Sequence, residues 1–369
     1  MEKIKWILNQ MPKNEDKNLA VMALDNVNQA RKFHRSFPQY SVTPLAKLDG
    51  MAGQLGLGGL FVKDESYRFG LNAFKVLGGS FAMAKYIAKE MGKDVSEMTY
   101  DYLTSKKFRD DFGQATFFTA TDGNHGRGVA WAANKLGQKA VVHMPKGSTQ
   151  TRFDNIAKEG ASVTIEELNY DDCVRLAAKE AAETPHGVIV QDTAWDGYEE
   201  IPSWIMQGYG SMAGEAAEQL REVEVNRPTH VFVQAGVGSL AGGVVGYFAN
   251  LYPNNPPKFI VMEAGAADCL YKGWRWRTKN RWWRSSDNHG RSCLWRTKYN
   301  WMGYFKKPCF RIYFLSRLGI CKGYENACSS SKRRSIRNIR RIRSGRNGSY
   351  FFYYDRRCLQ RTQRSIRVR

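Results

Sequence analysis

The stretch VFVQAGVGSLAGG, residues 231–243, places a strand, a glycine turn and a helix in direct succession. Apolar residues 231–234 favour a strand, Gly236 and Gly238 favour a tight turn, and residues 239–251 favour a helix. Backbone N–H groups in such a turn, aided by the helix dipole, can hold a phosphate group. The segment therefore predicts an α/β fold with an anion-binding loop.

Strand-like and helix-like segments alternate through most of the chain. Strands are expected at residues 60–63, 116–120, 140–143, 163–165, 188–191, 231–234 and 259–262. Helices are expected at residues 75–91, 124–136, 149–159, 170–183, 202–223 and 239–251. This alternation predicts an α/β fold of two domains, each an open, mostly parallel sheet flanked by helices. Ligands in such folds bind where loops leave the carboxyl ends of the strands.

Two further motifs carry residues suited to chemistry. NAFKVLGG, residues 72–79, places Lys75 at the start of a helix, where the dipole disfavours a free cation. An amine bound covalently near a phosphate would suit this position, although a solvated lysine is the alternative. TDGNHGRG, residues 121–128, supplies Asp122 and Asn124 between a strand and a helix, where a simple helix cap is the alternative. Glu263 lies near the distance expected for a dinucleotide site, so dinucleotide binding also stays open.

The order and spacing of these three motifs over residues 1–272 resemble the tryptophan-synthase-β-like, fold type II, family of pyridoxal-phosphate enzymes. The resemblance implies pyridoxal 5'-phosphate as cofactor and Lys75 as the Schiff-base lysine. It implies that Asn124 contacts the pyridine hydroxyl. The phosphate would be held by the turn of Gly236, Val237, Gly238, Ser239 and Leu240. The implied domains are a large cofactor-binding domain of residues 1–75 and 190–272 and a small domain of residues 76–189.

Finer features resemble the diaminopropionate ammonia-lyases within that family. These are Asp122 before the Gly-Asn-His turn, QDTAWDGY at residues 191–198 and IPSWIMQGY at residues 201–209. The resemblance implies elimination of ammonia from 2,3-diaminopropionate to give pyruvate. Lys75 and Asp122 are the candidate bases, on opposite faces of the cofactor, and Asp192 is the candidate partner of the substrate ammonium. A serine or threonine dehydratase of the same fold is the near alternative.

The last 97 residues differ sharply from the rest of the chain. Residues 273–369 hold 27 of the 56 Lys and Arg but 3 of the 35 Asp and Glu, which gives this segment a net charge of +24. The formal net charge of the whole chain is +21, so residues 1–272 carry −3. The segment has one alanine and one valine, yet six of the ten tryptophans. Ordinary globular sequence is rich in both small aliphatic residues.

A shifted reading frame would explain this composition. Residues 295–301, WRTKYNW, can be encoded so that the frame one base later reads Gly-Glu-Pro-Asn-Ile-Ile-Gly. Residues 341–345 can likewise give Gly-Glu-Ser-Gly-Ala, which resembles the segment that in this family places a serine by the pyridine nitrogen. We therefore expect residues 273–369 to be an aberrant, poorly ordered tail and the chain as written to be impaired or inactive. A genuine basic tail that binds nucleic acid is the alternative.

Composition also bounds the compartment and the partners. Two cysteines, Cys173 and Cys269, precede the tail, which suits a reducing compartment. The five tail cysteines form no CxxC pair, so no metal site is expected. No signal peptide or membrane span is evident. We expect a cytoplasmic homodimer that binds a small amino acid, with no nucleic-acid or membrane partner.

Overall fold

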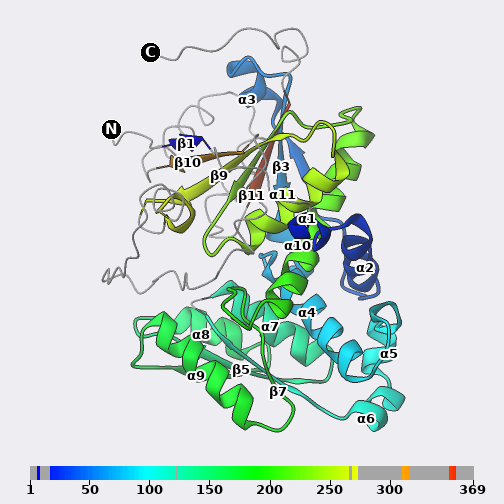
Figure 1. The fold of residues 1–369 in the computed structure, drawn as a ribbon, viewed down its shortest axis with the longest axis vertical. Helices are drawn as coiled ribbons and strands as arrows, with labels where there is room; N and C mark the ends of the chain where they lie inside the picture. The colour runs from blue at the N-terminus through cyan, green and yellow to red at the C-terminus, as the bar shows by residue number, and fades with distance from the viewer. Residues whose placement is uncertain are drawn as a thin grey trace.

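The computed structural model describes residues 6–8, 17–121, 123–265, 268–272, 310–315 and 349–354. Two β-sheets lie at opposite ends of the molecule, with helices α4 and α10 between them (Figure 1). The predicted α/β class, with sheets flanked by helices, is confirmed. No helix among the described residues is long and apolar enough to cross a membrane.

The smaller sheet has the strand order β6-β5-β4-β7, and all its neighbouring strands are parallel. Its strands are β4 (Thr116–Ala120), β5 (Lys139–Met144), β6 (Ser162–Ile165) and β7 (Gly187–Ile189). The helices α7 (Asn124–Lys135), α8 (Gln150–Ala157) and α9 (Tyr170–Glu183) connect them in turn. Each connection is a βαβ unit, which places successive strand ends at one edge of the sheet.

The larger sheet has the order β1-β10-β9-β8-β11-β3-β2. Its strands are β1 (Trp6–Leu8), β2 (Leu45–Lys47), β3 (Gly59–Asp64), β8 (His230–Gln234), β9 (Lys258–Ala264), β10 (Phe310–Leu315) and β11 (Ser349–Tyr354). The pairs β8–β9 and β9–β10 are parallel and the other four pairs are antiparallel. This sheet is therefore mixed rather than mostly parallel. A crossover helix, α11 (Ser239–Leu251), joins β8 to β9. The short link from β2 to β3 holds only α3 and allows antiparallel pairing.

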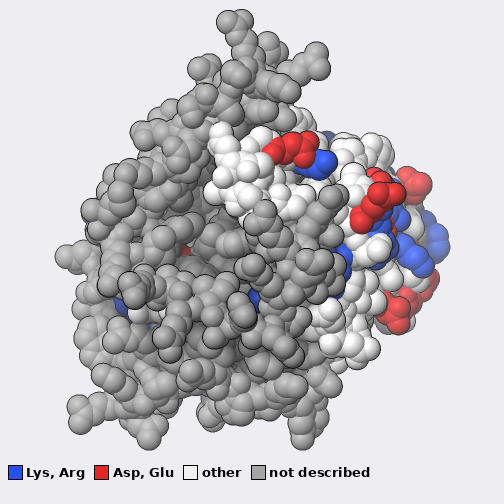
Figure 2. Space-filling model, turned by 90° about the horizontal axis from the view of Figure 1, so that it is seen from above, with Lys and Arg blue, Asp and Glu red and all other residues white. Residues whose placement is uncertain are grey.

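The remaining helices fill the space around and between the sheets. They are α1 (Lys17–Ala20), α2 (Leu24–Arg35), α3 (Asp49–Gln54), η1 (Glu65–Gly70), α4 (Lys75–Glu90), η2 (Val95–Glu97), α5 (Tyr100–Thr104), α6 (Lys106–Phe112) and α10 (Glu200–Glu222). The predicted starts of three helices, at Lys75, Asn124 and Ser239, are confirmed. On the face shown in Figure 2, acidic and basic side chains of the described residues are interspersed.

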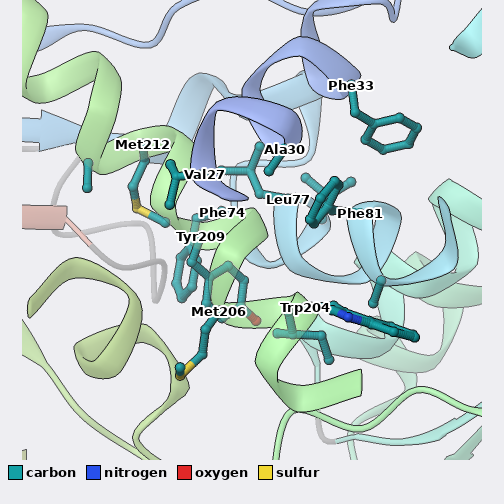
Figure 3. Packing of buried hydrophobic residues seen from close by; sticks show 14 of the residues in the cluster. Val27, Ala30, Phe33, Phe74, Leu77, Phe81, Trp204, Met206, Tyr209 and Met212 are labelled. Carbon is teal, nitrogen blue, oxygen red and sulfur yellow. The ribbon is translucent and has the colours of Figure 1, made fainter. Parts of the chain in front are cut away.

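The core between the sheets is built by α2, α4 and α10 (Figure 3). Phe33 of α2 and Phe81 of α4 are buried, and their ring centroids lie 6.0 Å apart. Helices α4 and α10 approach closely because each presents a glycine to the other. A Cβ added at Gly208 would lie 2.3 Å from the carbonyl oxygen of Leu77, and one added at Gly78 would lie 2.5 Å from the Tyr209 ring. The crossing of the two helices therefore depends on these glycines.

We predict that Gly208→Ala destabilises the protein by about 1–3 kcal/mol, because the added methyl group must push α10 away from the backbone of α4. Denaturant unfolding monitored by circular dichroism measures the change. Gly53→Ala is the matched control, since Gly53 lies in α3 and a Cβ there meets nothing within 4 Å. The control should gain roughly 0.5–1 kcal/mol from reduced backbone entropy. Equal stability of Gly208→Ala and the unaltered protein would contradict the packing argument.

Candidate active site

Lys75 is the first residue of α4, and its side chain lies between the two sheets. The backbone before it turns through left-handed conformations at Phe69, Gly70 and Asn72, with φ of 49°, 71° and 55°. Phe74 provides no side-chain cap, so the first N–H groups of α4 have no capping side chain. The Lys75 side chain is 25% exposed, and its Nζ forms an ion pair with the carboxylate of Asp192. The Lys75 side chain is thus partly exposed to solvent, and its amine is paired with the Asp192 carboxylate.

Asp192 follows β7 and is almost fully buried. Burial opposes ionisation of its carboxyl group, but the positive charge of Lys75 and its hydrogen bond to the carboxylate outweigh that effect. They lower the pKa of Asp192 to about 2. The carboxylate is therefore ionised at neutral pH, and it offers a fixed negative charge to an ammonium group at the position of Lys75 Nζ.

His125, in the first turn of α7, borders the same carboxylate. Its Nε2 donates to the carbonyl oxygen of Val190 at 2.9 Å, and its Nδ1 lies 4.0 Å from Asp192 Oδ2. Burial lowers the pKa of His125, so the ring is neutral and Nδ1 is an acceptor. The atoms His125 Nδ1 and Asp192 Oδ2 are thus both hydrogen-bond acceptors, and a donor group near both can form a hydrogen bond to each.

The glycine turn between β8 and α11 is tied to this pair. Gly238 has φ of 104°, a conformation that favours glycine, and α11 begins at Ser239. The Ser239 hydroxyl donates to the carbonyl oxygen of Asp192. A Cβ added at Gly236 would project into open space, with nothing within 4 Å. The turn is therefore bonded to Asp192, the ion-pair partner of Lys75, and no side chain caps the start of α11.

These residues fit the pyridoxal phosphate that the sequence resemblance implies. The open space at Gly236 suits a phosphate that approaches the backbone closely. Among the described residues, the buried atoms His125 Nδ1, Thr193 Oγ1 and Tyr209 Oη have no hydrogen-bond partner. Buried polar atoms are normally paired, so such a group of them suits a polar ligand. Lys75 Nζ supplies the amine that a covalently held aldehyde requires.

The structure brings together most of the site residues expected from the sequence. Lys75, Asp192 and Ser239 are joined by direct contacts, and Asn124 precedes His125 at the start of α7. Gly236, Val237, Gly238 and Leu240 form the turn and the start of α11 with Ser239. Asp122 lies outside the described residues. The roles assigned to these residues remain predictions.

Sequence reasoning did not single out Thr193 or Tyr209 as site residues. Tyr209 is fully buried in α10, its ring lies against Phe74 with centroids 5.0 Å apart, and burial raises its pKa well above the usual range. Its position depends on the contact of α10 with α4, which no local pattern reveals. The sequence IPSWIMQGY at residues 201–209 was the one indication of a role for Tyr209 in the quoted motifs, because it ends at this tyrosine.

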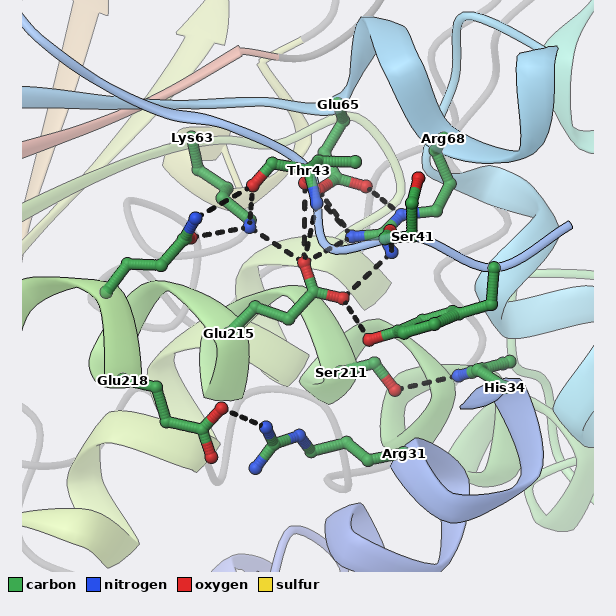
Figure 4. A network of polar contacts seen from close by, with 12 residues as sticks. Arg31, His34, Ser41, Thr43, Lys63, Glu65, Arg68, Ser211, Glu215 and Glu218 are labelled. Atoms are coloured by element: carbon green, nitrogen blue, oxygen red, sulfur yellow. Dashed lines mark hydrogen bonds and ion pairs between the residues drawn. The ribbon is translucent and has the colours of Figure 1, made fainter. Parts of the chain in front are cut away.

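A buried ion network fixes the segment that leads to Lys75 (Figure 4). Arg68 Nη2 donates to Glu65 Oε1 and to Glu215 Oε2, each at 2.8 Å, and Lys63 Nζ lies 2.7 Å from Glu215 Oε2. Thr43 Oγ1 donates to Glu65 Oε1 at 2.6 Å. All five side chains are essentially buried, and the charges of the four ionised ones sum to zero. The network joins β3 and η1 to α10 directly before the Lys75 turn.

The network sets the ionisation of Glu215. Burial opposes the charged form, but the hydrogen bonds and charge of Arg68, together with Lys63, lower the pKa of Glu215 to about 2. Burial also lowers the pKa of Lys63. A buried cation without a partner is costly, so removal of either carboxylate should destabilise the fold.

Comparison with known proteins gives a consistent picture. Residues 37–292 match the family described as "Pyridoxal-phosphate dependent enzyme". The chain is similar to a diaminopropionate ammonia-lyase of Salmonella typhimurium, with 50% identity over 273 residues, which are 73% of this chain and 67% of the relative. It is similar to that of Escherichia coli, with 49% identity over 245 residues, 66% of this chain and 60% of the relative.

The fold of the chain is also similar to that of a solved structure. It is the Escherichia coli diaminopropionate ammonia lyase "in complex with aminoacrylate-PLP azomethine reaction intermediate". The TM-score is 0.74 and the identity 40%, over 90% of this chain and 81% of that one. The matched part of the chain spans 67% of the Salmonella typhimurium relative and 60% of the Escherichia coli relative.

We predict that Glu215→Gln lowers the free energy of unfolding at pH 7 by about 3–5 kcal/mol, because Arg68 and Lys63 lose a buried partner. Glu222→Gln is the control on the same helix, since Glu222 is an exposed residue at the end of α10. Its loss should stay below about 1 kcal/mol. Equal losses in the two variants would contradict a stabilising role for the network.

The stabilisation of the fold by the Glu215 carboxylate should depend on pH. The pKa of Glu215 is lowered in the fold, so its stabilising effect is complete above the ordinary value of 4.5 and is lost as the pH falls toward 2. The gap in stability between the unaltered protein and Glu215→Gln should therefore narrow between these values. Urea unfolding over this pH range measures the gap, and a constant difference would count against the assignment.

Proposed function

The chain belongs to the pyridoxal-phosphate dependent enzymes, and on that premise we propose that it eliminates ammonia from 2,3-diaminopropionate to give pyruvate. The observation that carries the proposal is the ion pair between Lys75 and the buried Asp192 carboxylate, whose backbone is bonded to Ser239 of the glycine turn. Similarity to diaminopropionate ammonia-lyases over most of the chain supports the choice of substrate.

We assign the cofactor contacts to residues at three helix starts. Lys75 Nζ would hold the cofactor aldehyde, Asn124 would contact the pyridine hydroxyl, and the backbone N–H groups of residues 236–240 would bind the phosphate. When bound, pyridoxal phosphate supplies an electron sink for the carbanion at the substrate Cα. The open volume at Gly236 supports the phosphate assignment.

The remaining steps use the protein's own side chains. The amine Nζ of Lys75 would act as the base that accepts the proton from the substrate Cα. Asp122, which lies outside the described residues, is proposed as the base for the opposite enantiomer. The Asp192 carboxylate binds the substrate ammonium in the position where it now binds Lys75, and the neutral His125 Nδ1 is a second acceptor. Loss of the β-amino group and uptake of one water give pyruvate and two molecules of ammonia.

We also propose that the protein acts in the cytoplasm as a homodimer. Two cysteines in the first 272 residues suit a reducing compartment, and the family resemblance is the reason for proposing a dimer. Analytical ultracentrifugation of the purified chain tests the oligomeric state.

We predict that Lys75→Ala abolishes the visible absorbance band of the lysine-bound cofactor, because it removes the amine Nζ to which the cofactor aldehyde is proposed to bind. Absorbance titration with pyridoxal phosphate measures the band. Lys89→Ala is the control, since Lys89 lies at the exposed far end of the same helix. Retention of the band in folded Lys75→Ala would refute the assignment.

We predict that pyruvate forms faster from 2,3-diaminopropionate than from serine at equal concentration, because Asp192 selects a second ammonium group. A coupled assay for pyruvate measures both rates. Faster release from serine would favour a dehydratase.

The chain should be assayed beside one whose residues 273–369 are restored to the alternative frame. We expect the restored chain to be the more active and to bind the cofactor more tightly. Equal activity would contradict the frame-shift hypothesis.

A further inference from the structure

The hydroxyl group of Tyr198 holds the loop that carries Asp192 by hydrogen bonds to its backbone. Tyr198 is half-buried, and its hydroxyl accepts from the backbone N–H of Gln191 at 2.7 Å while donating to the carbonyl oxygen of Ile189 at 2.9 Å. Ile189 is the last residue of β7, and Gln191 directly precedes Asp192. The hydroxyl therefore joins the end of a sheet strand to the residue next to the carboxylate.

The local sequence explains how Tyr198 reaches back to the strand. Asp196-Gly197 forms a tight turn in which Gly197 has φ of 86°, and Trp195 and Tyr198 form a backbone bridge. The two rings stack with centroids 4.1 Å apart. An Asp-Gly pair is suited to such a turn, because it tolerates positive φ. Ring stacking and the turn hold the hydroxyl against the loop.

Other contacts fix the residues on either side of the same loop. The Gln191 side chain accepts from Thr119 Oγ1 at 2.8 Å and donates to the Tyr170 hydroxyl at 2.7 Å. The Val190 N–H donates to the carbonyl oxygen of Phe118 at 2.8 Å. Asp192 itself is held at its carbonyl oxygen by Ser239. Tyr198 can lose its hydroxyl oxygen, as phenylalanine, with little change of shape, and its hydroxyl contacts the loop backbone directly.

We propose that Tyr198 is a positioning residue for Asp192: its hydroxyl sets the backbone that aims the Asp192 carboxylate at Lys75 Nζ and, in the loaded enzyme, at the substrate ammonium. The inference rests on the proposed function for the substrate but not for the Lys75 contact. Without the hydroxyl, the buried Gln191 N–H loses its acceptor, and the loop must shift to satisfy it. A shifted carboxylate interacts more weakly with the positive charge on the Lys75 nitrogen.

The test uses Tyr198→Phe in the holoenzyme and follows the pH titration of the lysine-bound cofactor band. The Asp192 anion stabilises the protonated Lys75 nitrogen, so the midpoint should fall in Asp192→Asn. It should fall in Tyr198→Phe by a smaller amount, on the order of half a pH unit. Tyr198→Phe added to Asp192→Asn should cause no further shift, because the carboxylate through which it acts is gone.

Two more variants make the outcome decisive. Tyr252→Phe is the matched control, because its hydroxyl also donates to a backbone carbonyl, that of Asn226 at 2.7 Å, but lies outside the site. It should titrate as the unaltered enzyme. If Tyr198→Phe does not fold, Tyr170→Phe removes the contact on the other side of Gln191 and should move the midpoint in the same direction.

The results separate this proposal from the proposed reaction. A Tyr198→Phe midpoint equal to that of the unaltered enzyme would overturn the positioning role, even if pyruvate forms normally. So would a further shift when the substitution is added to Asp192→Asn. Failure of both the unaltered chain and the frame-restored chain to release pyruvate would refute the lyase assignment but leave the titration readable. With diaminopropionate as substrate, KM should rise several-fold in Tyr198→Phe.

Discussion

The buried network of Lys63, Glu65, Arg68 and Glu215 is the interaction on which the position of Lys75 depends. Two carboxylates and two cations share one apolar region, so each must keep its partner or leave a charge uncompensated. The chain leaves this network at Arg68 and passes at once through the left-handed residues Phe69 and Asn72. Left-handed conformations at non-glycine residues cost free energy and persist only where their surroundings impose them. The ion network supplies that constraint on one side of the turn.

Helix α4 supplies the constraint on the other side, because glycines let two helices approach its backbone. A Cβ added at Gly128 of α7 would lie 2.8 Å from the N atom of Val76, directly after Lys75. Gly208 of α10 makes a similar approach one residue further along. Close backbone contact leaves little freedom for relative sliding of packed helices. The distance from Lys75 to the His125 turn on α7 and to Tyr209 on α10 is therefore set by packing rather than by a hydrogen bond.

The sequence was informative where structure is determined locally. The starts of α4, α7 and α11 could be predicted because Lys75, Asn124 and Ser239 follow turn-forming residues and precede apolar periodic segments. The pairing of Arg68 with Glu215 could not be predicted, because it spans 147 residues. The same holds for Tyr209, whose place follows from helix packing. Tyr198 belonged to a recognised string, yet only the folded chain shows that its hydroxyl returns to Ile189 and Gln191.

The basic tail bears on the site through backbone geometry rather than charge. Its net charge of +24 lies apart from residues 1–272, where all the candidate site residues occur, so the charge says little about the ligand. Strand β11, however, lies between β3 and β8. Strand β3 leads through the ion network to Lys75, and β8 leads to the glycine turn. Neighbouring strands are about 4.8 Å apart, so one intervening strand sets these two strands about 10 Å apart. Strand pairing uses main-chain groups, so β11 maintains this spacing through its backbone. The tail thus affects the amine and the phosphate loop together, through the strand that separates them.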